Sequence, residues 1–288
     1  MKNCLKVLAQ YVIPKQAITA LAGKLAHYQG GDTTTKVITW FVKRYHVNMA
    51  EAANPDISSY KTFNEFFTRP LREGARPIEQ ADFICPVDGA ISQFGRIEQD
   101  QIFQAKGHYY STAALLGGDK AAAKNYLNGE FACLYLSPKD YHRIHMPCDG
   151  KLGKMTYVPG DLFSVNPVTA QGVPGLFARN ERVVCEFSSE KHGSFVMVLV
   201  GATIVGSMAT VWHNAKDGII NPPRQGHIQV WTYADQNITL KQGDEMGRFL
   251  LGSTVVMLFQ KDAMQFNAEW QATGPVKLGE IMGNSINK

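Results

Sequence analysis

The spacing of apolar residues predicts two amphipathic helices near the N-terminus. In the first, Leu5, Leu8 and Val12 recur at helical intervals, with polar residues between them. The second helix carries a broad apolar arc, with lysines together on its other side. The members of this arc are Val37, Ile38, Trp40, Phe41, Val42 and Tyr45. Such helices either lie in a membrane interface or pack on the body of the protein, and the pattern leaves both arrangements open.

Beyond residue 85 the pattern changes to short apolar runs separated by Gly and Pro turns, which is typical of strands. The predicted strands are Phe131–Leu136, Val183–Phe187, Phe195–Val200, Ala202–Val205, Ile228–Trp231 and Leu250–Phe259. One helix is predicted after residue 110, over Thr112–Tyr126. Before this region, a connector contains a short helix around Thr62–Phe67.

These elements predict an α+β protein in three parts. Residues 1–50 form an amphipathic helical segment, and residues 51–84 form a helical connector. Residues 85–288 form a β-rich domain, because many short strands at this spacing favour a mainly antiparallel β-sandwich or a barrel-like sheet.

Composition narrows the class of protein. The 288 residues are 45% hydrophobic and 19% charged, which is ordinary for a globular protein with a core. The five cysteines are scattered without a CxxC pair, which argues against a disulfide scaffold or zinc finger and for a reducing compartment. Since no window reaches the ~18 uninterrupted apolar residues of a spanning helix, we expect no transmembrane helix. The apolar stretch Cys4–Pro14 is short, is followed by Lys15 and has no convincing small-residue cleavage site, so we expect no cleaved signal.

Charge is distributed unevenly along the chain. Residues 1–50 contain seven basic residues and one acidic residue, a net charge of +6, whereas the whole chain carries +4. The remaining residues therefore carry −2. A basic segment on a near-neutral body indicates contact with an anionic surface. Its apolar content favours lipid over nucleic acid.

The tetrapeptide Leu251-Gly252-Ser253-Thr254 interrupts a strongly apolar run near the C-terminus. Glycine lacks a Cβ, so a hydroxyl can approach its carbonyl closely. The Ser253 hydroxyl can attack the Gly252 carbonyl through a five-membered ring, which begins an N-to-O acyl shift. The alternative is a strand with a glycine bulge and a buried serine.

Two histidines, His142 and His145, lie three residues apart just after a predicted strand. They can ligate a metal, although no third ligand stands out by spacing. They can serve as a general base and a substrate contact, or lie in a surface turn. Asp88 precedes a glycine in what is usually a plain turn. Together, however, Asp88, one histidine and Ser253 would supply an acid, a base and a nucleophile.

The loop over residues 157–166 has an apolar tip. An idle surface loop would be more polar, so this loop is either a packed Ω-loop or a flap that faces a substrate.

Taken in order along the chain, these and further segments resemble the bacterial phosphatidylserine decarboxylase proenzymes. The likeness covers nearly the whole sequence. The matching segments are Thr62–Phe67, Arg69–Arg72, Pro86–Gly89, Ala105–His108, Tyr135–Pro147, Val158–Asn166, Phe177–Val183, Val200–Ala202, Lys241–Phe249 and Leu251–Thr254.

The resemblance implies cleavage between Gly252 and Ser253 into chains 1–252 and 253–288. Ser253 would become a covalent pyruvoyl cofactor, which forms a Schiff base with the substrate amine. The family's self-cleavage residues map to Asp88, His145 and Ser253, and His142 is associated with decarboxylation. The mapped substrate contacts are Tyr135, His142, Phe163 and Ser164, and no metal is implied.

The implied reaction converts phosphatidylserine to phosphatidylethanolamine and CO₂ in phospholipid biosynthesis. The implied location is peripheral, on the cytoplasmic face of the inner membrane, and the expected partners are anionic lipid and the two chains themselves, with a homodimer also compatible. Two other interpretations stay open from the residues: a hydrolase that keeps Ser253 intact, although it lacks the G-x-S-x-G elbow, and a membrane-binding module without catalysis.

Overall fold

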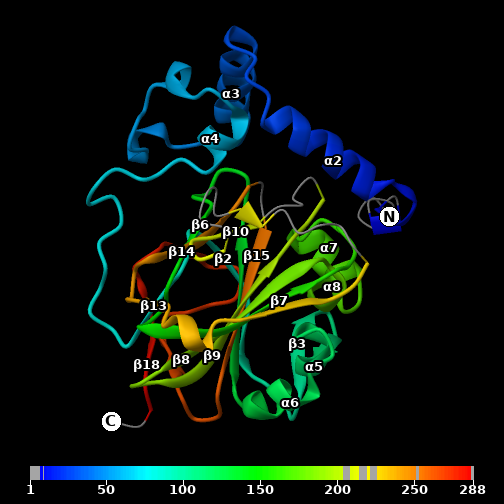
Figure 1. Ribbon diagram of the computed structural model, residues 1–288, viewed down its shortest axis with the longest axis vertical. Coiled ribbons are helices and arrows are strands. Elements are labelled where there is room, and N and C mark those ends of the chain that lie inside the picture. Colours follow the sequence, from blue (N-terminus) through cyan, green and yellow to red (C-terminus); the bar gives the residue numbers. More distant parts are fainter. Residues whose placement is uncertain are drawn as a thin grey trace.

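The computed structural model describes residues 7–8, 10–203, 208–213, 219–220, 226–250 and 253–286. Helices gather at one end of the molecule, above a sheet-rich body (Figure 1). The helices at this end are α2 (Lys15–Ala26), α3 (Asp32–Tyr45) and α4 (Phe63–Phe67), with 3₁₀ turns η1 (Met49–Glu51) and η2 (Ile57–Ser59).

A large antiparallel sheet forms the centre of the body. Its strand order is β12 (Gln229–Thr232), β7 (Gly150–Val158), β8 (Arg182–Ser189), β9 (Gly193–Val200), β15 (Ser253–Phe259), β5 (Glu130–Leu136), β2 (Gly89–Arg96) and β17 (Pro275–Val276), with β13 (Thr239–Leu240) also paired to β7. The strand β15 therefore lies between two long neighbours, and both pair with it antiparallel.

Smaller sheets flank this one. One has the order β11 (Ile219–Ile220), β10 (Met208–Thr210), β14 (Glu245–Phe249) and β6 (Arg143–His145). Another has the order β1 (Phe83–Ile84), β18 (Ile281–Asn284) and β16 (Gln265–Phe266), and β3 (Gln101–Ala105) pairs with β4 (His108–Ser111). Short helical segments complete the body: α5 (Thr112–Leu115), α6 (Lys120–Ala123), η3 (Lys124–Tyr126), α7 (Pro167–Gly172), α8 (Leu176–Arg179) and η4 (Ala234–Gln236).

Both faces of the large sheet are buried, and each belongs to a different core. Along β15, Val255 and Met257 face a core that includes Met208 and Phe249 of the second sheet. The alternate residue Val256 faces a core shared with the short helices α5, α6 and α8. One face of the large sheet thus packs against the second sheet, as in a sandwich, and the other face is covered by short helices. Because both faces are buried, these strands are continuously apolar.

The α+β prediction is confirmed, and within the described residues the sheets stay open rather than closing into a barrel. The predicted helix over Thr112–Tyr126 is wrong as one element: Gly117 and Gly118, at φ of 75° and 93°, separate α5 from α6. Helix α2 was not predicted from the sequence. The predicted strand from Leu250 begins only at Ser253, while Leu251 and Gly252 lie outside the described residues.

The helices form a small core of their own. Ile38 of α3 is fully buried with Phe66 and Phe67 of α4, and Phe41 packs against them. Thr62 begins α4 by accepting a hydrogen bond from the Glu65 amide, as an N-cap does. This cluster joins residues on both sides of the predicted boundary at residue 50. None of the helices that the structure describes combines the length and hydropathy needed to cross a membrane.

Candidate active site

Two of the predicted catalytic positions, Ser253 and Asp88, lie at the starts of strands that flank β5. Ser253 is the first residue of β15 and pairs with Leu136 near the end of β5. On the other side of β5, Ala90 of β2 pairs with Tyr135. Adjacent strands lie ~4.8 Å apart, so β15 and β2 flank β5 at about 10 Å from each other. The predicted Ser253 and Asp88 thus begin neighbouring segments at one edge, although the Ser253 side chain lies outside the described residues.

Gly89 allows this close arrangement. A Cβ at position 89 would lie 2.4 Å from the carbonyl oxygen of Tyr135, closer than any side chain could stand. The glycine therefore lets β2 approach β5 and holds the preceding residue, Asp88, at the strand edge.

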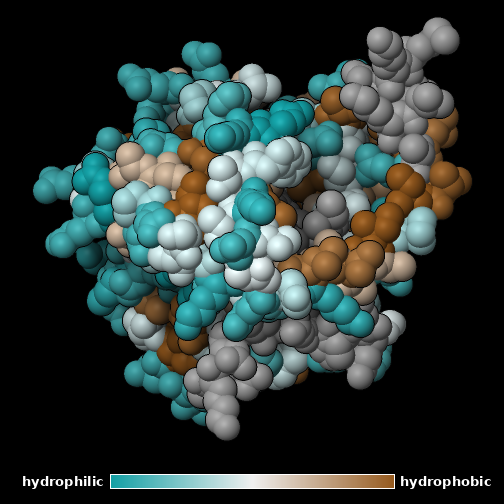
Figure 2. Space-filling model, turned by 90° about the horizontal axis from the view of Figure 1, so that it is seen from above, coloured by the Kyte–Doolittle hydropathy of each residue, from teal (hydrophilic) through white to brown (hydrophobic). Residues whose placement is uncertain are grey.

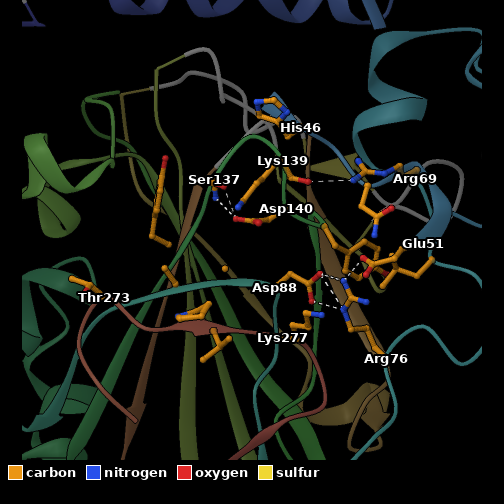
Figure 3. A pocket seen from close by; sticks show the side chains of 18 of the residues that line it. His46, Glu51, Arg69, Arg76, Asp88, Ser137, Lys139, Asp140, Thr273 and Lys277 are labelled. Carbon is orange, nitrogen blue, oxygen red and sulfur yellow. Dashed lines mark hydrogen bonds and ion pairs between the residues drawn. The ribbon is translucent and has the colours of Figure 1, made fainter. Parts of the chain in front are cut away.

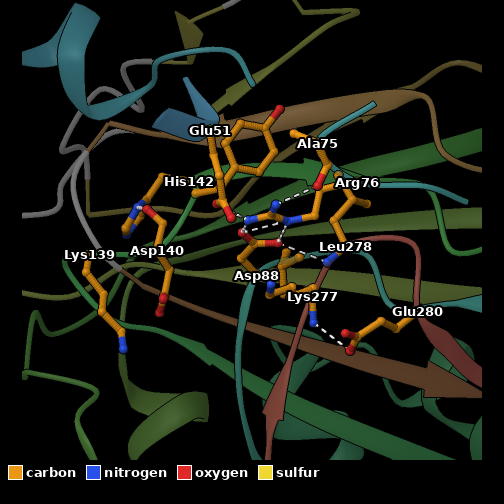
Figure 4. A network of polar contacts seen from close by, with 12 residues as sticks. Glu51, Ala75, Arg76, Asp88, Lys139, Asp140, His142, Lys277, Leu278 and Glu280 are labelled. Atoms are coloured by element: carbon orange, nitrogen blue, oxygen red, sulfur yellow. Dashed lines mark hydrogen bonds and ion pairs between the residues drawn. The ribbon is translucent and has the colours of Figure 1, made fainter. Parts of the chain in front are cut away.

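Asp88 is buried and held by an arginine from the connector. Arg76 donates from Nε to Oδ1 at 2.9 Å, and the backbone amide of Leu278 donates to the same oxygen at 3.0 Å. Arg76 also pairs with Glu51 at 2.6 Å (Figure 4). These bonds to Asp88 and Glu51 raise the pKa of Arg76. Among the described contacts Asp88 is bonded to Arg76 and Leu278, and not to His145.

His145 is oriented by a backbone carbonyl. Its Nδ1 lies 2.7 Å from the Gly243 oxygen, and because a carbonyl only accepts, Nδ1 carries the proton. The other ring nitrogen, Nε2, then accepts from the Tyr141 hydroxyl at 3.1 Å. Burial lowers the pKa of His145, partly opposed by the bond to Gly243. A neutral imidazole with a basic Nε2 is the form that a general base requires.

His142 is fully buried and packs on the ring of Phe67, with 4.0 Å between the centroids. Its Nδ1 donates to the Asp140 carbonyl at 2.8 Å, and its Nε2 has no partner among the described atoms. Burial lowers the pKa of His142 to about 3. Its carbonyl accepts from the Phe249 amide, which ties it to the chain shortly before Ser253. A buried nitrogen without a partner calls for a functional explanation.

A pocket of about 520 Å³ opens beside these residues, between the helical end and the edge of the sheet (Figure 3). Asp88, Tyr135 and Asp140 line it from the sheet domain, while His46 and Arg69 line it from the helical part. Burial raises the pKa of Tyr135 and of Asp140.

The other predicted substrate contacts lie elsewhere. Phe163 is buried beneath Lys15, whose Nζ lies 3.7 Å from the ring centroid. The amide of Ser164 donates to the Gln10 side chain at 2.8 Å. The loop over residues 157–166 is therefore packed against the N-terminal segment, and it contributes neither Phe163 nor Ser164 to the pocket.

Sequence analysis missed Arg76, Tyr141 and the Gly243 carbonyl. Arg76 lies in the connector, and no local pattern marks an arginine that will meet an aspartate in the fold. Within the part of the chain that the structure describes, His, Cys, Asp and Glu side chains do not gather in threes as a metal site would need.

Ionisable side chains line this pocket, among them Asp140, whose pKa is raised, and His142 and His145, whose pKa values are lowered, lie in the same segment of the chain. Such a pocket is characteristic of an enzyme. Comparison with known proteins identifies the family. The model described as phosphatidylserine decarboxylase matches residues 63–284, and a second, described as PSD, matches residues 5–46. The chain therefore belongs to the phosphatidylserine decarboxylase family.

Full-length relatives agree with this assignment. The phosphatidylserine decarboxylase proenzyme of Dechloromonas aromatica (strain RCB) is 68% identical over 287 residues and covers 100% of both chains. That of Azoarcus sp. (strain BH72) is 65% identical, over 99% of this chain and 97% of the relative. That of Methylobacillus flagellatus is 67% identical, over 96% and 97%.

Proposed function

We propose that this chain cleaves itself between Gly252 and Ser253 and then decarboxylates phosphatidylserine to phosphatidylethanolamine, a step of phospholipid biosynthesis. The observation that carries the proposal is the position of Ser253. It is the first residue of a central strand and pairs with Leu136, next to Tyr135 of the pocket wall, in a chain that belongs to a decarboxylase proenzyme family.

For self-cleavage, the Tyr141 hydroxyl stops donating to Nε2 of His145, and this nitrogen then removes the Ser253 hydroxyl proton. The alkoxide attacks the Gly252 carbonyl, the peptide C–N bond breaks, and an ester links Gly252 to the Ser253 oxygen. β-Elimination breaks the Cβ–O bond and releases the Gly252 carboxylate. Residue 253 is left as dehydroalanine, which water converts to a pyruvoyl group and ammonia. The fixed negative charge of Asp88, held by Arg76, stabilises the protonated imidazole that forms.

The surroundings fit a pyruvoyl group at position 253. That group supplies an electron-withdrawing carbonyl that accepts the electron pair left when CO₂ departs. The unpartnered Nε2 of His142 is available to hold or deliver a proton there. The ring of Phe67 against His142 excludes water, and Tyr135 shapes the pocket wall.

The N-terminal helices are proposed to attach the enzyme to the membrane surface. Leu21 and Leu25 of α2 are 60% and 63% exposed, and Trp40 of α3 is 60% exposed. Hydrophobic surface gathers on the side of the molecule where α2 lies (Figure 2). With the +6 charge of residues 1–50, this supports peripheral binding to anionic lipid on the cytoplasmic face of the inner membrane.

The apolar arc predicted on α3 is divided between the core of the helical part and the exposed surface. Ile38 is buried and Phe41 packs in the helical core, whereas Val37 and Trp40 remain exposed. The three-part division at residues 50 and 84 and the homodimer stay predictions.

Intact mass tests the proposal. The purified chain of 31.9 kDa should yield a fragment of residues 253–288, about 4 kDa, whose N-terminus carries no amine. S253A should remain at full length, because no hydroxyl is left to attack, while the control S194A should be cut normally. A wild-type chain that stays intact but binds vesicles would favour the membrane-module alternative. One that stays intact and hydrolyses esters would favour the hydrolase.

A further inference from the structure

Arg69 is a buried cation with few partners at the wall of the pocket. It lies two residues after the end of α4 and is 4% exposed. Its Nη1 and Nη2 make only long hydrogen bonds, both at 3.4 Å, to the carbonyls of Phe66 and Lys139. Its Nε has no partner among the described atoms, and the ion pairs found there do not include it. Burial lowers the pKa of Arg69, since a charge away from water is costly without a counter-ion.

The other charges around the pocket do not satisfy Arg69. Asp88 and Glu51 are both engaged by Arg76. The Asp140 carboxylate accepts from the amide and hydroxyl of Ser137, at 2.7 Å each. Lys139 lines the same pocket and adds a second positive charge (Figure 3). An anionic ligand in the pocket would therefore meet Arg69 and Lys139, and neither side chain belongs to an ion pair among the described residues; Lys277 lines the pocket as well.

We propose that Arg69, together with Lys139, binds the phosphodiester of the lipid headgroup. This inference rests on the proposed decarboxylase function and adds the subsite that recognises its substrate. A guanidinium fork matches phosphate oxygens in geometry, and a deeply buried one gives a strong charge-assisted bond.

The phosphodiester suits this site better than the substrate carboxylate does. A cation bound to the carboxylate would stabilise the charge that decarboxylation must remove, and so would slow the reaction. The phosphodiester keeps its charge from substrate to product. A cation that holds it strengthens binding equally in the ground state and the transition state, which affects KM and not kcat.

The placement of Arg69 agrees with the layout of a phospholipid. Arg69 lines the pocket near the helical end of the molecule, while Asp88, Ser137 and Asp140 line it from the sheet-rich body (Figures 1 and 3). In phosphatidylserine the phosphate lies between the reacting serine and the glycerol with its acyl chains. Arg69 thus lines the pocket from the end of the molecule that also carries the proposed membrane-facing helices.

The test measures kinetics of self-cleaved enzyme on phosphatidylserine in detergent mixed micelles. R69Q should raise KM by about 10- to 100-fold with little change in kcat, because a hydrogen-bonded charge is worth ~1.5–3 kcal/mol. R69K should restore part of the affinity, and K139Q should raise KM more weakly. The matched control is R72Q, which removes an exposed arginine bonded to the Ala50 carbonyl and outside the pocket lining.

Inhibitors separate the ligand groups. Phosphatidylethanolamine carries the phosphodiester without the carboxylate, so its inhibition of wild type should weaken in R69Q by the same factor as KM rises. Unchanged inhibition by phosphatidylethanolamine, beside a raised KM, would assign Arg69 to the carboxylate and overturn the proposal. Inorganic phosphate should inhibit far more weakly than phosphatidylethanolamine, and equal potency would mean a free-phosphate site instead.

Cleavage to the 4 kDa chain reports whether each variant has a folded site. A wild-type enzyme that is cut but does not decarboxylate would refute the proposed function itself. Active wild type with an unchanged KM in R69Q would refute only this inference. Should R69Q remain uncut, R69K and K139Q decide in its place, and an unchanged KM in both would overturn the proposal.

Discussion

At the scale of single residues, His142 and His145 illustrate how burial prepares similar side chains for different tasks. Both imidazoles have a lowered pKa and so stay neutral near physiological pH. His145 has Nδ1 bound to Gly243 and Nε2 facing the Tyr141 hydroxyl. His142 has Nδ1 bound to Asp140, and its Nε2 is unpartnered. These surroundings support the proposal that one acts in cleavage and the other after it.

We expect H145A to slow self-cleavage by about 10²- to 10⁴-fold, the usual loss for a general base. D88N should also impair cleavage, because it removes the charge that stabilises the imidazolium. H142A should still be cut but should decarboxylate poorly. Time courses on denaturing gels, with CO₂ release measured separately, check these outcomes. Normal cleavage of H145A, or an uncut H142A, would show that the two roles are reversed.

His142 also predicts a pH dependence of stability. Its pKa is about 3 in the folded chain, whereas an unfolded histidine titrates near 6.5. Between these values the unfolded state binds a proton that the folded state does not. The free energy of unfolding should therefore decrease as pH falls below about 6.5, by up to ~1.4 kcal/mol per pH unit from this residue.

Urea unfolding of the uncut S253A chain at pH 7, 5 and 4 measures this effect. H142N, whose amide can replace the Nδ1 bond to Asp140, should flatten the decrease, because no titrating ring remains at the buried site. The control H227N changes an exposed histidine and should leave the slope as it was. An unaltered slope in H142N would contradict the assignment.

At the scale of elements, α2 presents apolar side chains that the rest of the described chain does not cover. The double variant L21Q/L25Q should weaken binding to anionic vesicles by at least about tenfold, because fully burying one leucine contributes ~1.5–3 kcal/mol. Flotation or sedimentation with vesicles measures it. I78Q alters a similarly exposed side chain, 47% exposed, in the connector and should bind normally. Equal binding by L21Q/L25Q would locate the membrane contact elsewhere.

At the scale of the whole molecule, the proposed cleavage falls at the start of a central strand. Thr254–Phe259 pair with β9 on one side and β5 on the other, and their side chains enter both cores. The segment after residue 253 also supplies β16, β17 and β18 to other sheets. Cutting the backbone before Ser253 leaves all of these contacts in place.

The small chain should therefore remain bound to the large one after cleavage. Native gel filtration of processed protein should give one peak that contains both chains, and only denaturant should separate them. Uncut S253A, run in parallel, should elute at the same volume. Loss of the 4 kDa chain without denaturant would contradict the structure.

Sequence alone determined the features that depend on local pattern. Apolar runs located β5, β8, β9 and β12 to within a few residues, and helical spacing located α3. The motifs around Asp88, His142, His145 and Ser253 predicted a catalytic site from residue chemistry and family resemblance, and that assignment stays a prediction.

Tertiary structure decided which partners these residues have. The hydrogen bonds of Arg76 with Asp88 and of Gly243 with His145, and the packing of α3 on α4, depend on the path of the whole chain. Likewise, two glycines with positive φ broke an alanine-rich helix, and Phe163 packed beneath Lys15 instead of lining the pocket. Local sequence encodes conformation and residue chemistry, whereas contacts between distant segments arise only when the sheets and cores bring those segments together.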